Sequence, residues 1–255
     1  MASRIALLCL LGLLVASPAI ADSGVYYQLA LMWPGAYCEQ SKTGCCKPTN
    51  SGKSPARDFY ISGFTVYNAT TEEPVTGCND QAPFDPNLID GIPGLNQYWS
   101  SIKCPSNNGK KNWKSVWKKS GACSGLKEKD FFETALTFRS RLNPLVRLKA
   151  KHIEPDFGLY GVKAIKGVFK SSINAEPLVQ CSNGPSEFGK YQLYQIVFCA
   201  SETGNFIDCP GAEYSKYGCP AKEIIFHPFQ KWMLKQTAAE AYDPFVLPGL
   251  EDADE

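Results

Sequence analysis

The order of apolar and polar residues along the chain predicts several β-strands. Residues 26–33, Tyr-Tyr-Gln-Leu-Ala-Leu-Met-Trp, have the composition of a buried strand, and Pro34-Gly35 ends it. Residues 59–67 also have strand composition, and Gly63 within them indicates a bulge or a close backbone approach. Further strands are predicted at 191–200, 204–208 and 223–226.

Three segments are expected to be helical, two of them because their apolar residues recur at helical spacing. Asp130 is placed to cap a helix over 131–142, and a similar pattern runs from Tyr160 to Ile173. A short segment rich in Trp and Lys around 111–120 is also expected to be helical. Strands and helices do not alternate regularly, so the pattern favours an α+β fold over a doubly wound sheet. No linker divides the chain, which predicts a single domain.

The two ends of the chain differ from the rest in composition. Arg4 is followed by an apolar run and by the small-x-small pattern Ala19-Ile20-Ala21, so residues 1–21 are interpreted as a cleaved signal peptide. The run is shorter than the roughly 20 apolar residues that a membrane span needs. Residues 230–255 end in Glu-Asp-Ala-Asp-Glu and are interpreted as an acidic C-terminal tail. The domain is therefore expected over 22–229, in a protein that is secreted or vacuolar.

The charge balance excludes a general attraction to polyanions. The whole chain has a net charge of +1, and loss of the signal peptide removes Arg4 and brings the charge to zero. A nucleic-acid partner would need a local patch, and no membrane partner is expected. The lysines around Trp113 and Trp117 are one such patch, in which Lys118, Lys119 and Trp117 are candidate RNA-binding residues through phosphate contacts and base stacking. A solvated helix face with both tryptophans in the core is the alternative, and we favour it.

Cysteine usage predicts an oxidising compartment. Besides Cys9 in the signal peptide, the chain contains ten cysteines, an even number that predicts five disulfides, although spacing alone does not give the pairs. There is no Cys-x-x-Cys motif and the only histidines are His152 and His227, so neither a metal site nor a cofactor is expected. Asn68-Ala69-Thr70 is a glycosylation sequon, and we expect a glycan on Asn68 in a secreted protein.

Several motifs, in order, resemble the plant S-like ribonucleases of the ribonuclease T2 family. They are Trp33–Cys38 followed by Cys45-Cys46, then Phe59–Phe64, Trp113–Cys123, Gln192–Cys199 and Asp208–Pro210, so that the resemblance spans about 26–229. It implies a monomeric, disulfide-rich α+β domain with a central, mainly antiparallel sheet and flanking helices. It also implies the disulfides Cys38–Cys45, Cys46–Cys104, Cys78–Cys123, Cys181–Cys219 and Cys199–Cys209.

The two blocks that carry activity in that family differ here. The first reads Phe-x-Ile-His-Gly-Leu-Trp-Pro in the family, and this chain has Ser62 at the histidine and Phe64-Thr65-Val66 at Leu-Trp-Pro. The second reads His-Glu-Trp-x-Lys-His-Gly-Thr-Cys, and here Ser115, Val116 and Ser120 replace its two histidines and its glutamate. Leu31 and Met32 stand where the family has glutamines before Trp33, which implies a lost base contact.

Enzymes of this family cleave RNA by attack of the ribose 2′-OH on the adjacent phosphate, giving a 2′,3′-cyclic phosphate. Each proton-transfer group supplies roughly 10²–10⁴-fold, and a serine hydroxyl does not replace imidazole in that role. The resemblance therefore implies a catalytically inactive protein with no catalytic residue and a storage, stress or defence role. Two alternatives stay open: an RNA-binding protein that uses the degenerate cleft, and an endoribonuclease with residual activity.

Overall fold

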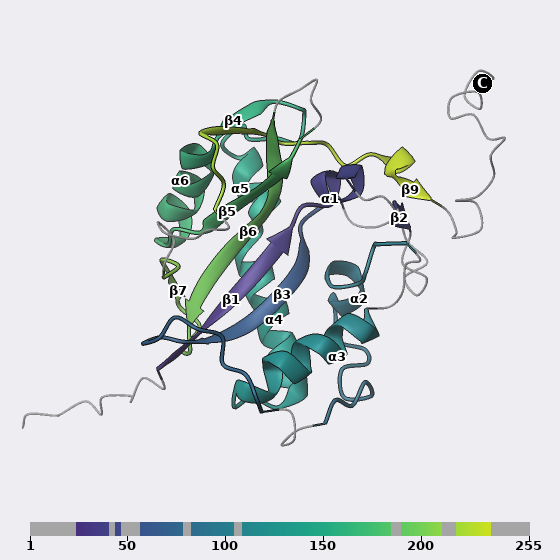
Figure 1. Ribbon diagram of the computed structural model, residues 1–255, viewed down its shortest axis with the longest axis vertical. Coiled ribbons are helices and arrows are strands. Elements are labelled where there is room, and N and C mark those ends of the chain that lie inside the picture. Colours follow the sequence, from purple (N-terminus) through teal and green to yellow (C-terminus); the bar gives the residue numbers. More distant parts are fainter. Residues whose placement is uncertain are drawn as a thin grey trace, which may run out of the picture.

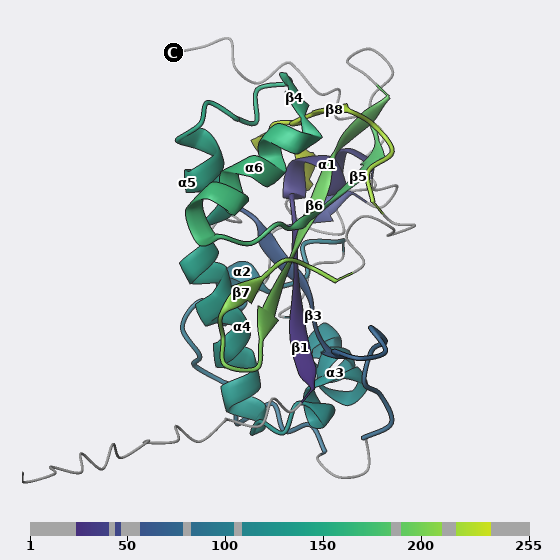
Figure 2. The ribbon, with the colours of Figure 1, turned by 90° about the vertical axis from the view of Figure 1, so that its left-hand side faces the viewer.

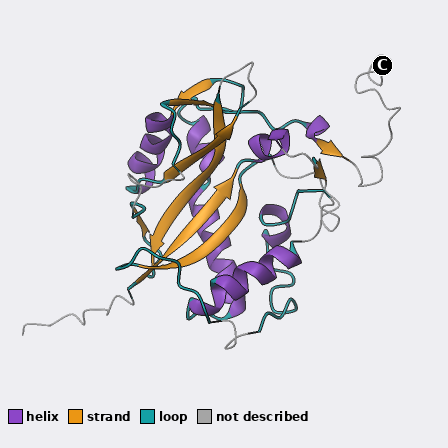
Figure 3. Ribbon diagram, in the orientation of Figure 1, coloured by secondary structure: helices purple, strands orange, loops and turns teal. Residues whose placement is uncertain are grey.

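The computed structural model describes residues 24–40, 44–46, 57–78, 83–104, 109–184, 190–210 and 218–235. A twisted sheet runs through these residues, with helices on one of its faces and beside one of its edges (Figure 1, Figure 3). The sheet contains β1 (Val25–Met32), β3 (Tyr60–Asn68), β4 (Leu159–Gly161), β5 (Leu178–Asn183), β6 (Tyr191–Ser201), β7 (Phe206–Ile207) and β8 (Glu223–Ile225). The helices are α1 (Pro34–Gln40), α2 (Leu95–Tyr98), α3 (Lys110–Lys119), α4 (Glu128–Leu142), α5 (Pro144–Lys149) and α6 (Val162–Ile173), with short 3₁₀ turns η1 (Gly121–Cys123) and η2 (Lys231–Met233).

The sheet is mainly antiparallel. Its order is β3-β1-β6-β8-β4, with β5 and β7 also paired to β6, and the contact between β6 and β8 is the parallel exception in this sheet. Strand β3 therefore lies at an edge of the described sheet. A separate pair joins β2 (Cys45–Cys46) to β9 (Leu234–Lys235). This architecture confirms the expected α+β fold.

The bulge expected near Gly63 lies in β3, beside that glycine. Ala30 of β1 faces Gly63, and Leu31 faces Ile61, so Ser62 is the extra residue that has no partner across the strands. A bulge of this kind bends a strand and re-aims the side chain that it carries.

Aromatic side chains from the sheet and from α4 form the part of the core that fixes β3. The ring of Phe64 lies 4.8 Å from that of Phe131 and 6.0 Å from that of Phe138, and Tyr27 stacks on Phe64. Figure 2 shows α4, α5 and α6 along one face of the sheet, with α3 on the other side of β1 and β3. Burial of rings of this size dominates core energetics, so the sheet edge and α4 form one packed unit.

Two helix boundaries differ from the sequence-based expectation. Helix α4 begins at Glu128 after Lys127, and Asp130 lies in its first turn rather than at the cap. A carboxylate in the first turn interacts favourably with the helix dipole. Asp130 therefore indicated the start of the helix, although the helix begins two residues before it. Tyr160 lies in β4 because residues 159–161 pair with β8, and α6 begins at Val162.

The structure contains the five disulfides that the resemblance implies: Cys38–Cys45, Cys46–Cys104, Cys78–Cys123, Cys181–Cys219 and Cys199–Cys209. The described start of the proposed tail, 230–235, packs on the domain, since β9 pairs with β2 and Met233 is buried. The proposed signal peptide and residues 236–255 lie outside the described residues.

Candidate functional site

A hollow of about 430 Å³ lies between the edge strand β3 and helix α3. Its volume is within the range of small-molecule sites, roughly 300–1,000 Å³. We call it the β3–α3 hollow, and it is lined by Gly63, Phe64, Thr65, Pro74, Thr76, Val116, Lys119 and Ser120. Three of these residues, Val116, Lys119 and Ser120, come from the second block identified in the sequence. Of the first block, Gly63 and its two successors line the hollow, whereas Ser62 does not.

Ser120 is buried and holds the edge strand. Its side chain is 3% exposed, and its Oγ accepts a hydrogen bond of 2.6 Å from the backbone N–H of Val66. The carbonyl of Val66 accepts a second bond from the backbone N–H of Val75. Because β3 is an edge strand, the N–H of Val66 has no partner on a neighbouring strand. A buried N–H without an acceptor would cost about 1–3 kcal/mol. Ser120 therefore supplies the acceptor that the strand needs at Val66.

Ser62 lies in a different environment. It is the bulged residue of β3, its side chain is exposed, and its Oγ is 3.1 Å from both the carbonyl of Ala30 and Oε1 of Gln195. Gln195 in turn donates to the side chain of Gln180 on β5. The hydroxyl of Ser62 thus belongs to a polar row on the sheet surface.

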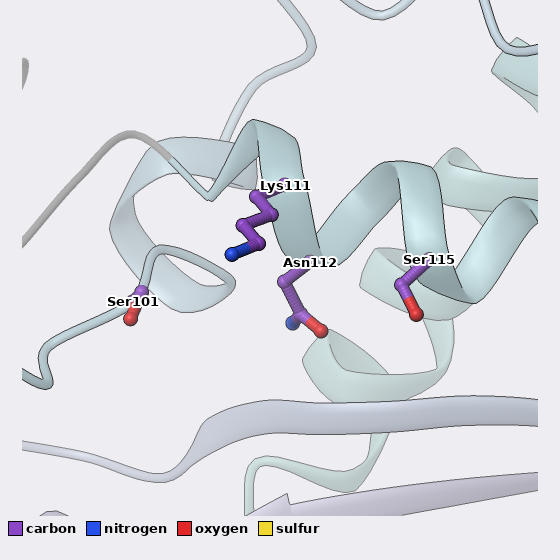
Figure 4. Close-up of a pocket in the computed structure, with 4 residues that line it drawn as sticks. All are labelled: Ser101, Lys111, Asn112 and Ser115. Carbon is purple, nitrogen blue, oxygen red and sulfur yellow. The ribbon is translucent and has the colours of Figure 1, made fainter.

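Ser115 opens into a second, smaller hollow at the N-terminal half of α3. This hollow has a volume of about 290 Å³ and is lined by Ser101, Lys111, Asn112 and Ser115. Figure 4 shows Asn112 and Ser115 side by side on α3, with Lys111 reaching towards the loop that carries Ser101. The three serines at the family's histidine positions therefore lie in three different places. Ser120 makes a buried contact, Ser62 is exposed on a strand, and Ser115 lines a separate hollow.

Trp117 cannot take the base-stacking role that the sequence analysis considered. Its side chain is 2% exposed and its ring packs edge-on against Phe131 at 5.7 Å. Trp113 is also buried, and its Nε1 donates to the carbonyl of Trp99. Lys118 and Lys119 are exposed. The burial of both tryptophans follows from their spacing of four residues, which places them on one side of α3.

The remaining candidate residues lie away from both hollows. His227 is 3% exposed, its Nδ1 lies 2.8 Å from the carbonyl oxygen of Pro228, and its ring packs against Phe157. His152 is exposed in a turn with φ of 56°. Leu31 and Met32 are buried in β1. Neither histidine lines the hollow beside β3 or the hollow beside Ser101.

Among the described residues, no group of three or more His, Cys, Asp or Glu side chains is arranged to hold a metal ion. No described helix combines the length and apolar character that a membrane crossing requires.

The fold and the site define a disulfide-stabilised α+β domain with a mainly apolar hollow between a sheet edge and a helix. The model of the ribonuclease T2 family matches residues 24–209. The chain belongs to the ribonuclease T2 family.

Relatives of this chain include both ribonucleases and a storage protein. Ribonuclease 1 of Arabidopsis thaliana is 34% identical over 235 residues, which cover 88% of this chain and 98% of that protein. The ribonuclease-like storage protein of Panax ginseng is 32% identical over 188 residues, covering 72% of this chain and 74% of that protein. Among solved structures, RNase NT in complex with 5′-AMP superposes with a TM-score of 0.71 at 32% identity, covering 80% of this chain and 98% of that one.

Proposed function

We propose that this protein is a catalytically inactive member of the ribonuclease T2 family that serves as a storage, stress or defence protein. The observation that carries the proposal is the lining of the β3–α3 hollow, which among the described residues includes no imidazole and no carboxylate. General acid–base catalysis near neutral pH needs a group that both takes and returns a proton, and such groups supply roughly 10²–10⁴-fold each. Lys119 offers positive charge for a phosphate, which alone leaves only residual catalysis.

The serine hydroxyls do not replace the missing groups. The Oγ of Ser120 accepts the Val66 N–H, and the Oγ of Ser62 contacts Ala30 and Gln195. An activated serine needs an adjacent base within hydrogen-bond reach, and neither contact supplies one. The storage role is supported by the similarity to the ribonuclease-like storage protein of ginseng, since a fold can be kept while the chemistry of its site is lost.

A cleavage assay tests the proposal. Homogeneous protein is incubated with single-stranded RNA from pH 4 to 8, and 2′,3′-cyclic phosphate ends are quantified beside an active plant T2 ribonuclease purified in the same way. We expect no product above background. A rate within roughly 10²-fold of the active enzyme would show residual endoribonuclease activity instead, because one proton-transfer group is worth about that much.

We further propose that the protein follows the secretory pathway and carries a glycan on Asn68. Five disulfides are typical of proteins that fold in an oxidising compartment. Asn68 ends β3, and its Oδ1 accepts the backbone N–H groups of Thr70 and Thr71 in a surface turn. Mass spectrometry of protein from the native tissue should find an N-terminus near residue 22 and a glycosidase-sensitive Asn68 peptide. An intact N-terminal segment in the purified protein would refute secretion.

A further inference from the structure

The wall of the β3–α3 hollow is mainly apolar. Phe64, which is fully buried, belongs to its β3 side, and Val116, which is half-buried and packs on the core, belongs to its α3 side. Thr65 of β3, with Pro74 and Thr76 from the segment that follows this strand, completes the apolar part of the lining. Because removal of apolar surface from water is favourable, such a wall favours a ligand with an apolar body.

The segment 74–76, which forms the third side of the hollow, is fixed at both ends. The N–H of Val75 donates to the carbonyl of Val66 on β3 at 2.9 Å. Shortly after the segment, Cys78 is joined by a disulfide to Cys123 in η1, directly beyond α3. A ligand that enters a site whose walls are already in place orders little of the protein, so less of its binding energy is lost. The hollow is therefore preorganised in the free protein.

The hollow also holds one buried hydrogen-bond donor and one cation. Ser120 is 3% exposed, its Oγ accepts the N–H of Val66, and its own hydroxyl hydrogen is donated to no other residue that the structure describes. A hydroxyl can donate one hydrogen bond while it accepts another. Lys119 is exposed and lines the same hollow, and it takes part in none of the ion pairs within the described ranges. Two adjacent residues thus supply an ammonium group and a buried O–H.

We propose that the β3–α3 hollow binds a small apolar carboxylate, whose body enters the hollow while its two oxygens accept hydrogen bonds from Ser120 and Lys119. One carboxylate charge balances one ammonium charge, and two donors match two oxygens. A phosphate monoester carries about −1.5 to −2 charges on three oxygens, so the same donors would leave charge unpaired beside an apolar wall, which is costly. At about 430 Å³ the hollow suits a ligand with a single ring.

This binding is additional to the proposed function and requires neither a storage role nor the absence of catalysis. The chemistry of the hollow differs from that of a site for proton transfer, because the ligand is held and not changed. Cyclic phosphate ends on RNA would refute the proposed inactivity and leave the binding of a carboxylate as it is. The two proposals therefore fail separately.

An amide NMR titration of the isotope-labelled protein with 3-phenylpropionate tests the proposal. We expect saturable binding with a dissociation constant below about 1 mM, an ordinary affinity for a ligand of about 11 non-hydrogen atoms. The shifted amides should belong to residues 63–66, 74–76 and 116–120. The amide 3-phenylpropionamide keeps the shape without the charge and should bind at least about threefold more weakly, as is usual on loss of a partly exposed ion pair. Phenyl phosphate should also bind more weakly than the carboxylate.

Two neighbouring lysines provide a charge-matched pair of variants. Lys119→Gln removes the cation of the hollow, whereas Lys118→Gln removes an exposed lysine that is not among the lining residues. Lys119→Gln should weaken binding of 3-phenylpropionate at least about threefold and leave binding of its amide unchanged. Lys118→Gln should leave both affinities within about 1.5-fold of wild type, because salt screens charges outside the site.

Two valines on helices provide a size-matched pair. Val116→Trp places a large ring in the hollow and should weaken both ligands at least about tenfold, since a filled pocket excludes them. Val146→Trp makes the same change on α5, where the side chain is 58% exposed, and should leave both affinities at the wild-type value. Circular dichroism verifies that each variant folds, and the lysine pair decides the question if Val116→Trp does not.

Several results would overturn the proposal. The first is no saturable shift with 3-phenylpropionate up to about 10 mM, which is too weak for a built site of this size. Equal binding of the amide, or an equal loss in both lysine variants, would show that Lys119 does not hold a carboxylate. Tighter binding of phenyl phosphate would make the hollow a phosphate site. Shifts confined to other parts of the chain would place the ligand elsewhere.

Discussion

Ser62 and Ser120 both stand where the resemblance to ribonuclease T2 places a histidine, yet the structure gives them opposite surroundings. Ser62 is exposed on a strand bulge, and its contacts are to a carbonyl and to the amide of Gln195. Ser120 is 3% exposed, and its Oγ is the acceptor for the buried Val66 N–H across 54 residues of sequence. One serine is a surface residue, and the other is part of the framework of the edge strand.

The difference shows that Ser120, at a position where the family motif has a histidine, has a structural role in this chain. The family motif has proline where this chain has Val66, and proline has no N–H to satisfy. Val66 in this chain has a buried N–H, and Ser120 provides its acceptor. The two residues therefore depend on each other, because loss of the Ser120 hydroxyl leaves the Val66 N–H without its acceptor. Ser62 has no such dependence, because water can replace its contacts.

The largest effect is expected from breaking the pair formed by Ser120 and Val66. Ser120→Ala leaves the Val66 N–H without its acceptor and should lower the free energy of unfolding by about 1–3 kcal/mol. Val66→Pro removes the donor, and an edge strand tolerates proline where the N–H points away from the ladder. In the double variant both partners are gone, so its loss should be smaller than the sum of the two single losses.

A double-mutant cycle in chemical denaturation measures this coupling. The cycle cancels the packing change that Val66→Pro also introduces, and residues in direct contact typically couple by about 0.5–3 kcal/mol. Thr65→Ala, combined with Ser120→Ala, is the control, because Thr65 lines the same hollow while the hydrogen bond of Ser120 goes to Val66. Additive losses for Val66 and Ser120 would show that the hydrogen bond does not hold the strand.

The fold was predictable where pattern and local chemistry agree. The apolar residues of β1 and β6 and the spaced tryptophans of α3 identify these elements, because burial of one face decides their structure. The bulge could be placed only approximately, since Gly63 permits it but the residue that is looped out depends on the register with β1. The helix over Pro34–Gln40 was missed, because Pro34-Gly35 was interpreted as the end of a strand and not as a helix start.

The site was predictable only in its composition. The serines and Val116 are visible in the sequence, but nothing local distinguishes Ser62 from Ser120. Their difference arises because β3 lies at the sheet edge and turns the N–H of Val66 towards η1. The departure at Val66 was visible as a change from the family pattern, and its link to Ser120 required the tertiary structure. The hollow beside Ser115 likewise depends on Ser101, which belongs to a different segment.

A buried polar group with an incomplete set of partners should give a smaller, pH-dependent effect. Glu128 is 5% exposed, its Oε2 accepts the backbone N–H of Asp85, and its Oε1 has no partner among the described residues. Burial raises the pKa of this carboxyl, and the negative charge of Asp85 adds to the effect. The folded state therefore binds the proton more tightly than the unfolded chain, and ionisation of Glu128 opposes folding as the pH rises.

Glu128→Gln should remove that pH dependence. Below about pH 4, where the carboxyl is protonated in both states, the variant and the wild-type protein should be about equally stable. As the pH rises through the elevated pKa, the variant should become the more stable of the two, and the difference should level off above it. Thermal unfolding between pH 3 and 8 measures this. The opposite result would be a stability difference, variant minus wild type, that is lower at pH 7 than at pH 3. It would show that the fold stabilises the Glu128 carboxylate.

The smallest effect is expected at Ser62, which is exposed, whereas Ser120 is buried. Ser62→His should change the free energy of unfolding by no more than about 0.5 kcal/mol, as is usual for surface substitutions. The new imidazole would be solvated, so its pKa should lie close to about 6.5, which an NMR titration can measure. It should also restore no RNA cleavage, because the hollow that Ser120 and Val116 line would still have no second proton-transfer group. A loss of stability as large as that of Ser120→Ala would mean that the contacts among Ser62, Gln195 and Gln180 stabilise the fold. In that case neither serine could be replaced by histidine without a loss of stability.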